Sequence, residues 1–289
     1  MTTDIKKYVF KEGLPLEFEL VSLTELYGKH KEHLTQPHRT AFYHILWFQQ
    51  SSPTHLVDFN PVKVNPNTLL FLNKDVVQIF DKTGNIDGKA ILFTDNFFCQ
   101  TIEDMKFLRN TIVFNDLFSV SQIELGKIST SLIEVFNLME AEFTNKKDIY
   151  RAEVLQNYLH NFLLMAERER RKQDFIEIKK GANLDYTLLF KDLLEAQFKT
   201  IKQVSNYAAQ LSITENRLNQ ATSKVLGKTP KQMIDERIVL EAKRLLAHTN
   251  DSIKEVGFSL GFEEPTNFIK YFRKHLHATP VEFREKLSA

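Results

Sequence analysis

Residues 252–280 read SIKEVGFSLGFEEPTNFIKYFRKHLHATP, and their pattern indicates how the C-terminal region folds. Its apolar spacing predicts a short helix over 253–260, a turn at Gly261 and a longer helix over 264–276. A short helix, a tight turn and a second helix form a helix-turn-helix unit, whose second helix enters the major groove of DNA.

The same pattern occurs about 50 residues upstream, where it predicts helices over 204–211 and 214–226. The matching segments are 201–204 with 253–256, and 227–230 with 277–280. Three capping boxes mark helix starts in these copies: Thr229 with Gln232, Ser252 with Glu255, and Thr279 with Glu282. The C-terminal region is therefore predicted to be all helical, with two helix-turn-helix units.

Each longer helix has an apolar face and a polar face. The inward residues are predicted to be Leu218, Thr222 and Val225 in the first and Phe268, Phe272 and Leu276 in the second. Amides suit adenine edges, while Arg and Lys suit guanine or phosphate, so the outward residues are candidate DNA contacts. They are Asn216, Arg217, Asn219, Gln220, Lys224, Thr266, Asn267, Lys270, Arg273 and Lys274. The alternative is that these side chains are simply solvated.

A predicted helix over 230–248 connects the two units and could hold them in consecutive major grooves, since it would be roughly 27 Å long. The whole chain has 38 basic and 37 acidic residues, so its charge alone indicates no partner. Residues 182–289 hold 16 Lys and Arg against 13 Asp and Glu, which favours DNA only mildly.

The N-terminal region is predicted to be a β unit, because runs rich in β-branched and aromatic residues alternate with turn signals. The runs are 42–48, 54–59, 68–72, 76–80 and 90–94. After residue 119 the apolar period changes to that of two amphipathic helices joined near Asn145, which pack on the barrel or on a partner chain. The expected divisions are 1–118 (β sensor domain), 119–172 (helical hairpin), 173–184 (linker) and 185–289 (helix-turn-helix domain).

In combination, several segments resemble the AraC/XylS family of bacterial transcription regulators. They are 241–246, 252–256, 260–262, 267–268, 271–274, 279–280 and 283–284. Residues 36–98 are more weakly similar to the cupin-like effector domain of that family, notably at 37–39 and 65–70. The resemblance implies an α+β chain of two domains: a cupin-like β-barrel with a helical hairpin, and an all-α domain with tandem helix-turn-helix units. It implies promoter binding, activator function and a dimer, with RNA polymerase as a further candidate partner.

The sequence departs from the family pattern at three positions. His277 stands where a glycine usually ends the last recognition helix, and histidine adopts the left-handed conformation only at some cost. Gln220 and Lys270 stand where the family often has arginine, so the resemblance does not determine the target bases.

Three possibilities remain open for the barrel. Candidate effector contacts are His38, Arg39, His44 and Trp47, and an arginine there favours an anionic ligand. The alternatives are a filled barrel without a ligand, or a cupin-type metalloenzyme fused to a DNA-tethering module. His38, His44 and His55 lack a matching acid at short range, which disfavours a metal.

We therefore expect a regulator that is not an enzyme and uses no cofactor. Cys99 is expected to be a small buried apolar residue, since a single cysteine cannot form an internal disulfide. Neither a signal peptide nor an apolar run of membrane-spanning length is evident, so a cytoplasmic location without membrane contact is expected.

Overall fold

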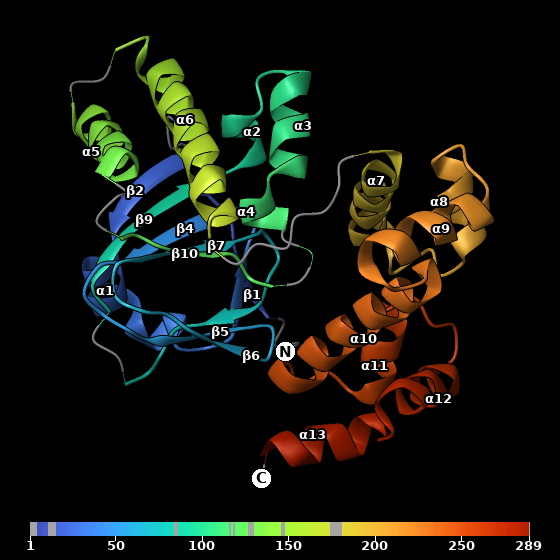
Figure 1. Ribbon diagram of the computed structural model, residues 1–289. Coiled ribbons are helices and arrows are strands. Elements are labelled where there is room, and N and C mark those ends of the chain that lie inside the picture. The colour runs from blue at the N-terminus through green and yellow to red at the C-terminus, as the bar shows by residue number, and fades with distance from the viewer. Residues whose placement is uncertain are drawn as a thin grey trace. The chain divides into compact units, whose positions relative to one another are not determined.

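The computed structural model describes residues 5–10, 16–83, 86–115, 117, 119–126, 130–145, 148–173 and 181–288. These residues fall into two compact units (Figure 1): the β strands and six helices of 6–173 form one, and the helices of 181–288 form the other. The expected two-domain α+β architecture is confirmed.

The first unit contains two five-stranded sheets. One is antiparallel throughout, in the order β10-β7-β4-β9-β2. Its strands are β2 (Phe18–Ser22), β4 (Tyr43–Phe48), β7 (Thr68–Leu72), β9 (Gly88–Phe93) and β10 (Gln122–Glu124). The sheet therefore extends to Glu124, beyond the expected division at 118.

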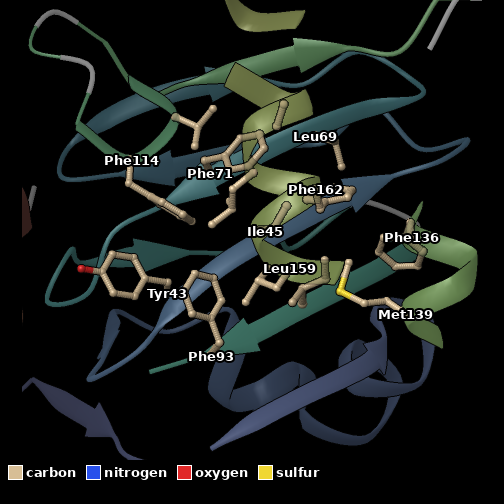
Figure 2. Close-up of a cluster of buried hydrophobic side chains, with 14 of the residues drawn as sticks. Tyr43, Ile45, Leu69, Phe71, Phe93, Phe114, Phe136, Met139, Leu159 and Phe162 are labelled. Atoms are coloured by element: carbon tan, nitrogen blue, oxygen red, sulfur yellow. The ribbon is translucent and has the colours of Figure 1, made fainter. Parts of the chain in front are cut away.

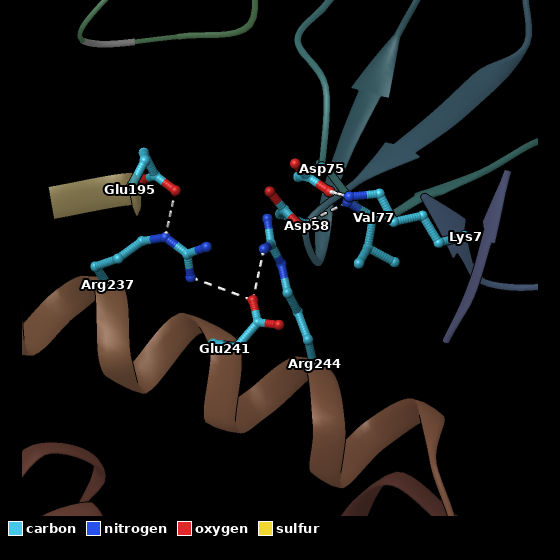
Figure 3. Close-up of polar contacts among 8 residues, drawn as sticks. All are labelled: Lys7, Asp58, Asp75, Val77, Glu195, Arg237, Glu241 and Arg244. Atoms are coloured by element: carbon cyan, nitrogen blue, oxygen red, sulfur yellow. Dashed lines mark hydrogen bonds and ion pairs between the residues drawn. The ribbon is translucent and has the colours of Figure 1, made fainter. Parts of the chain in front are cut away.

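The other sheet has the order β1-β3-β8-β5-β6, with a parallel pair, β1 and β3. Its strands are β1 (Lys6–Tyr8), β3 (His38–Thr40), β5 (Thr54–Val57), β6 (Asn60–Lys63) and β8 (Gln78–Ile79). The predicted strand over 54–59 ends early, because Asp58 and Phe59 both have positive φ and form the two-residue turn into β6. The carboxylate of Asp58 accepts a bond from the Val77 amide, and Lys7 pairs with Asp75 (Figure 3).

Strand β4 is buried on both faces and divides two cores. Ile45 and Trp47 join the core shared with the helices, whereas Leu46 and Phe48 join the core that also contains Val57 of the other sheet. This double burial explains why the strand is a continuous apolar run rather than an alternating one.

The first unit also has six helices, α1 (Leu23–Leu34), α2 (Asp95–Phe98), α3 (Ile102–Asn110), α4 (Ile112–Asn115), α5 (Thr130–Thr144) and α6 (Arg151–Arg171). The predicted hairpin is formed by α5 and α6. Figure 2 shows Phe136 and Met139 of α5, with Leu159 and Phe162 of α6, packed on the sheet around Ile45. The hairpin thus buries its main apolar face on its own chain. The Lys146–Lys147 part of its predicted turn lies outside the described residues.

The second unit is helical, as predicted. Its helices are α7 (Ala182–Gln197), α8 (Val204–Gln210), α9 (Glu215–Leu226), α10 (Pro230–His248), α11 (Ile253–Ser259), α12 (Pro265–Leu276) and α13 (Pro280–Ser288). The capping boxes at Thr229, Ser252 and Thr279 all form. His277 ends α12 in the left-handed conformation, at φ 55°.

Candidate nucleic-acid interface and internal cavity

Helix α9 is the second helix of the first helix-turn-helix unit. The hydroxyl of Thr214 caps it by accepting a bond from the Arg217 amide, and Leu218, Ala221 and Thr222 bury one face. Four of the five predicted contact residues in this helix are exposed: Asn216, Asn219, Gln220 and Lys224. They form a polar face that is available to a partner.

Arg217 is held by the protein itself. Its Nη1 donates to Asn183 Oδ1 at 2.7 Å, and its guanidinium lies 4.9 Å from the ring centroid of Tyr186. Both partners belong to α7, so Arg217 fastens α9 to the helix that precedes the first unit. The sequence pattern gave no sign of this contact, because Asn183 and Tyr186 lie more than 30 residues upstream.

Helix α12 is the corresponding helix of the second unit. Phe268 and Phe272 are fully buried on its inner face, and Gly257 of α11 leaves room for Phe268. All five predicted contact residues of this helix are exposed: Thr266, Asn267, Lys270, Arg273 and Lys274. Three of the five are basic, which suits a surface that approaches a nucleic-acid backbone.

A hydrogen-bond cluster fixes α12 on the connecting helix α10. Asp235 Oδ1 accepts bonds from the Tyr271 hydroxyl at 2.6 Å and from Lys231 Nζ at 2.5 Å. His275 Nε2 lies 3.8 Å from the other carboxylate oxygen. Burial and the Asp235 carboxylate both raise the pKa of Tyr271, so its hydroxyl stays protonated and donates.

A second cluster fixes α10 on α7 (Figure 3). Buried Glu241 accepts bonds from Arg237 at 3.2 Å and Arg244 at 2.8 Å, while Arg237 also donates to Glu195 at 2.8 Å. The Arg237 guanidinium lies 3.8 Å from the ring centroid of Phe198. Helix α10 has 19 residues, which corresponds to a length of about 28 Å. The contacts described above brace this long connecting helix.

The first unit contains a cavity of about 490 Å³. It is lined mainly by apolar side chains from both sheets, from α1 and from the N-terminal segment. The lining residues are Tyr8, Val9, Phe10, Glu19, Leu26, His30, His33, Leu34, His38, Thr40, Phe42, His44, Leu46, Phe80, Ala90 and Leu92. Its size lies in the range of small-molecule sites, so the interior is not filled.

Two of the four predicted effector residues, His38 and His44, line this cavity. Arg39 and Trp47 are not among the described residues that line it. Trp47 faces the opposite side of the sheet, packs on Phe136 and donates from Nε1 to Asn67 Oδ1 at 3.0 Å. Arg39 is half-buried on β3, between the cavity-lining residues His38 and Thr40.

Burial favours the neutral form of three histidines of this unit, His38, His44 and His55. Burial is the largest cause that lowers the pKa of His44 to about 3 and that of His55 to about 4, and it also lowers the pKa of His38. Gln78 lies between two of them, with its Oε1 3.0 Å from His55 Nε2 and its Nε2 3.4 Å from His44 Nε2. The sequence pattern does not indicate that Gln78 contacts two histidines, because its strand is only two residues long.

The structure also bears on the expectations for Cys99, for a metal site and for membrane-spanning helices. Cys99 is half-buried beside the helix-facing core, and desolvation raises the pKa of its thiol to about 11, which disfavours a reactive thiolate. Across the described ranges, three or more His, Cys, Asp or Glu side chains nowhere gather in a way that could hold a metal ion. Nor does any helix of that part of the chain combine the length and apolarity needed to cross a membrane.

Comparison with known proteins gives the same assignment for the C-terminal unit. A helix-turn-helix domain model matches residues 207–286. An uncharacterized helix-turn-helix transcriptional regulator of Bacillus subtilis, YisR, is 30% identical over 95 residues, which cover 33% of each chain. This chain therefore spans a third of that relative's length. The transcriptional activator RhaS of Klebsiella pneumoniae is 21% identical over 86% of this chain and 87% of its own. ToxT of Vibrio cholerae matches 95% of this chain and 96% of its own, at 13% identity and a TM-score of 0.43.

The duplicated units and the matched domain model define a tandem helix-turn-helix DNA-binding domain. The relatives named above are transcription regulators, so the C-terminal unit is similar to the helix-turn-helix domains of such proteins.

Proposed function

We propose that this chain regulates transcription by binding promoter DNA through α9 and α12, and that a small molecule in the cavity modulates this binding. The observation that carries the proposal is the pair of exposed polar helix faces, each backed by a buried core and joined by one braced connector. The name of the relative RhaS, a transcriptional activator, supports activation as the output.

The proposed DNA contacts are the nine exposed residues of the two faces, whereas Arg217 positions α9. The exposed contacts are Asn216, Asn219, Gln220, Lys224, Thr266, Asn267, Lys270, Arg273 and Lys274. On this proposal the target is a tandem site whose halves lie one helical turn apart, roughly 10 base pairs. The affinity falls as salt rises, since basic residues displace counterions from the phosphates.

We further propose that the regulator is a homodimer and acts in the cytoplasm. Leu138 on α5 and Leu164 on α6 are about half exposed, which supports a homodimer formed through the hairpin. A cytoplasmic regulator that contacts RNA polymerase and has no enzymatic activity fits the AraC/XylS family. A linker over about 173–184 remains part of this proposal, and the division expected at 118 falls after β10, because β10 pairs with β7.

The test is selection of bound fragments from random DNA by the full chain. We expect a motif with two half-sites, and we expect the double substitution Gln220→Ala with Lys270→Ala to erase it. Lys286→Ala, an exposed lysine on α13, is the matched control and should keep the motif. Recovery of a single half-site, or of the same motif with the double variant, would contradict recognition of DNA by both α9 and α12.

A further inference from the structure

The cavity of the first unit has the chemistry of a site for an uncharged ligand. Most of its wall is apolar, with Phe42, Leu46 and Phe80 among the buried contributors. Its described lining includes neither Lys nor Arg, and the carboxyl of Glu19 is its one acidic group. Burial raises the pKa of Glu19, which shows that a negative charge is disfavoured at this wall.

One lining residue, His44, has a ring nitrogen whose hydrogen-bonding capacity is unused in the described structure. His44 is 6% exposed, and its Nδ1 is buried without a hydrogen-bond partner in the described structure. Buried polar atoms normally have partners, so an unpaired ring nitrogen on a residue that lines the cavity is a hydrogen-bonding group that a bound molecule would satisfy.

The neighbouring hydrogen bonds determine what His44 offers. His55 Nε2 donates to Gln78 Oε1, which leaves the Gln78 amide nitrogen to donate to His44 Nε2. His44 Nε2 is thus an acceptor, and because this imidazole is neutral, its proton must be on Nδ1. His44, which lines the cavity, therefore carries a buried N–H donor that has no partner in the described part of the chain.

We propose that the cavity binds an uncharged, largely apolar small molecule that accepts a hydrogen bond from His44 Nδ1, as a ketone, ester or lactone carbonyl does. This inference rests on the proposed function only in taking the cavity as the effector site. A carboxylate would need a cation, and Arg39, the sequence-based candidate for that role, does not line the cavity. A hydrocarbon would leave the His44 donor unpaired.

Three probes of nearly equal shape test the ligand class on the unmodified full chain: 4-phenylbutan-2-one, 3-phenylpropanoate and butylbenzene. Binding is measured by calorimetry at pH 7.5, where the acid is ionised. We expect the ketone to bind about three- to tenfold more tightly than the hydrocarbon, which is the range for one net hydrogen bond, and the carboxylate to bind most weakly.

Variants assign the effect to the proposed atom. His44→Leu should bring ketone affinity down to that of butylbenzene, while Trp47→Phe, on the other face of the same strand, should leave the ranking unchanged. Equal or tighter binding of 3-phenylpropanoate would overturn the uncharged-ligand class and leave a ligand-binding regulator intact. Binding of none of the three would overturn the inference, and the DNA selection would still test the regulator separately.

Discussion

Gly261 lies so close to the backbone of Lys199 that a Cβ at position 261 would stand 1.9 Å from the Lys199 carbonyl oxygen. The ammonium of Lys202 strengthens this contact by donating to the carbonyls of Gly261, at 2.7 Å, and Lys199, at 3.2 Å. The turn of the second helix-turn-helix unit is therefore fastened to the segment that precedes the first unit. This contact, as well as α10, sets how the two recognition helices are oriented.

We predict that Gly261→Ala lowers the free energy of unfolding of the C-terminal unit by about 1 to 3 kcal/mol. Gly261 has φ +73°, and the added methyl group would also meet backbone that cannot move aside cheaply. Gly227→Ala is the matched control, because Gly227 has φ +68° and open space around its Cβ position. Urea denaturation of both variants should show the larger loss for Gly261→Ala. Equal losses would mean that the contact with Lys199 relaxes without cost.

We predict that Arg217→Ala and Lys270→Ala weaken DNA binding for different reasons. Arg217 holds α9 to α7 through Asn183, so its loss should lower the melting temperature and weaken binding to cognate and random DNA alike. Lys270 is exposed, so its loss should leave the melting temperature unchanged and cost about 1 to 3 kcal/mol on the cognate site if it pairs with a base.

Fluorescence anisotropy on cognate and random duplexes, with thermal melting of the same samples, separates the two roles. Asn183→Ala removes the partner of Arg217 without touching α9, so it should reproduce the Arg217→Ala pattern. A selective loss on cognate DNA for Arg217→Ala, with normal melting for Asn183→Ala, would show that Arg217 leaves α7 to read a base.

The sequence predicted the C-terminal unit closely, because prolines and capping boxes mark its helix starts. The connector was expected over 230–248 and spans Pro230–His248. The helical pattern does not show which outward-facing residue contacts another helix. Arg217 lies on the polar face of α9, yet α7 packs beside it.

The N-terminal sheets were predicted less completely. Strands β1, β3 and β6 read KKY, HRT and NPVK, which are short and polar and carry no apolar alternation. Strand β4 was found, but its apolar run does not show which residues face which core. For that reason the sequence pattern does not distinguish Trp47, which faces the core shared with the helices, from His44, which lines the cavity.

We predict that the N-terminal unit loses stability as pH falls below about 6.5. The folded-state pKa values of His44 and His55 are lowered to about 3 and about 4, whereas the unfolded histidines titrate near their ordinary value. The unfolded chain therefore binds more protons below that value, and the stability that is fully present above it declines with pH. Each histidine should cost about 1 kcal/mol between pH 6.5 and 5.5.

Urea denaturation of the full chain at pH 7.5, 6.5 and 5.5 measures this decline. His38, whose pKa is lowered by burial as well, adds to the same slope. His44→Leu should reduce the slope by roughly the contribution of one proton. A free energy of unfolding of the N-terminal unit that stays constant from pH 7.5 to 5.5 would contradict neutral burial of these imidazoles.

We predict that Tyr271 contributes more to the free energy of unfolding than Lys231, although both donate to the Asp235 carboxylate. The Tyr271 hydroxyl is half-buried between α12 and α10, so Tyr271→Phe leaves part of the Asp235 charge without a donor and should cost about 1 to 3 kcal/mol. Lys231 is 53% exposed, so Lys231→Met removes a surface ion pair and should cost less than about 1 kcal/mol. Because Tyr271 anchors the second recognition helix, Tyr271→Phe should also weaken binding to a two-half-site duplex more than to an isolated first half-site. Anisotropy with both duplexes checks this, and an equal effect on the two would show that α12 keeps its orientation without the Asp235 bond.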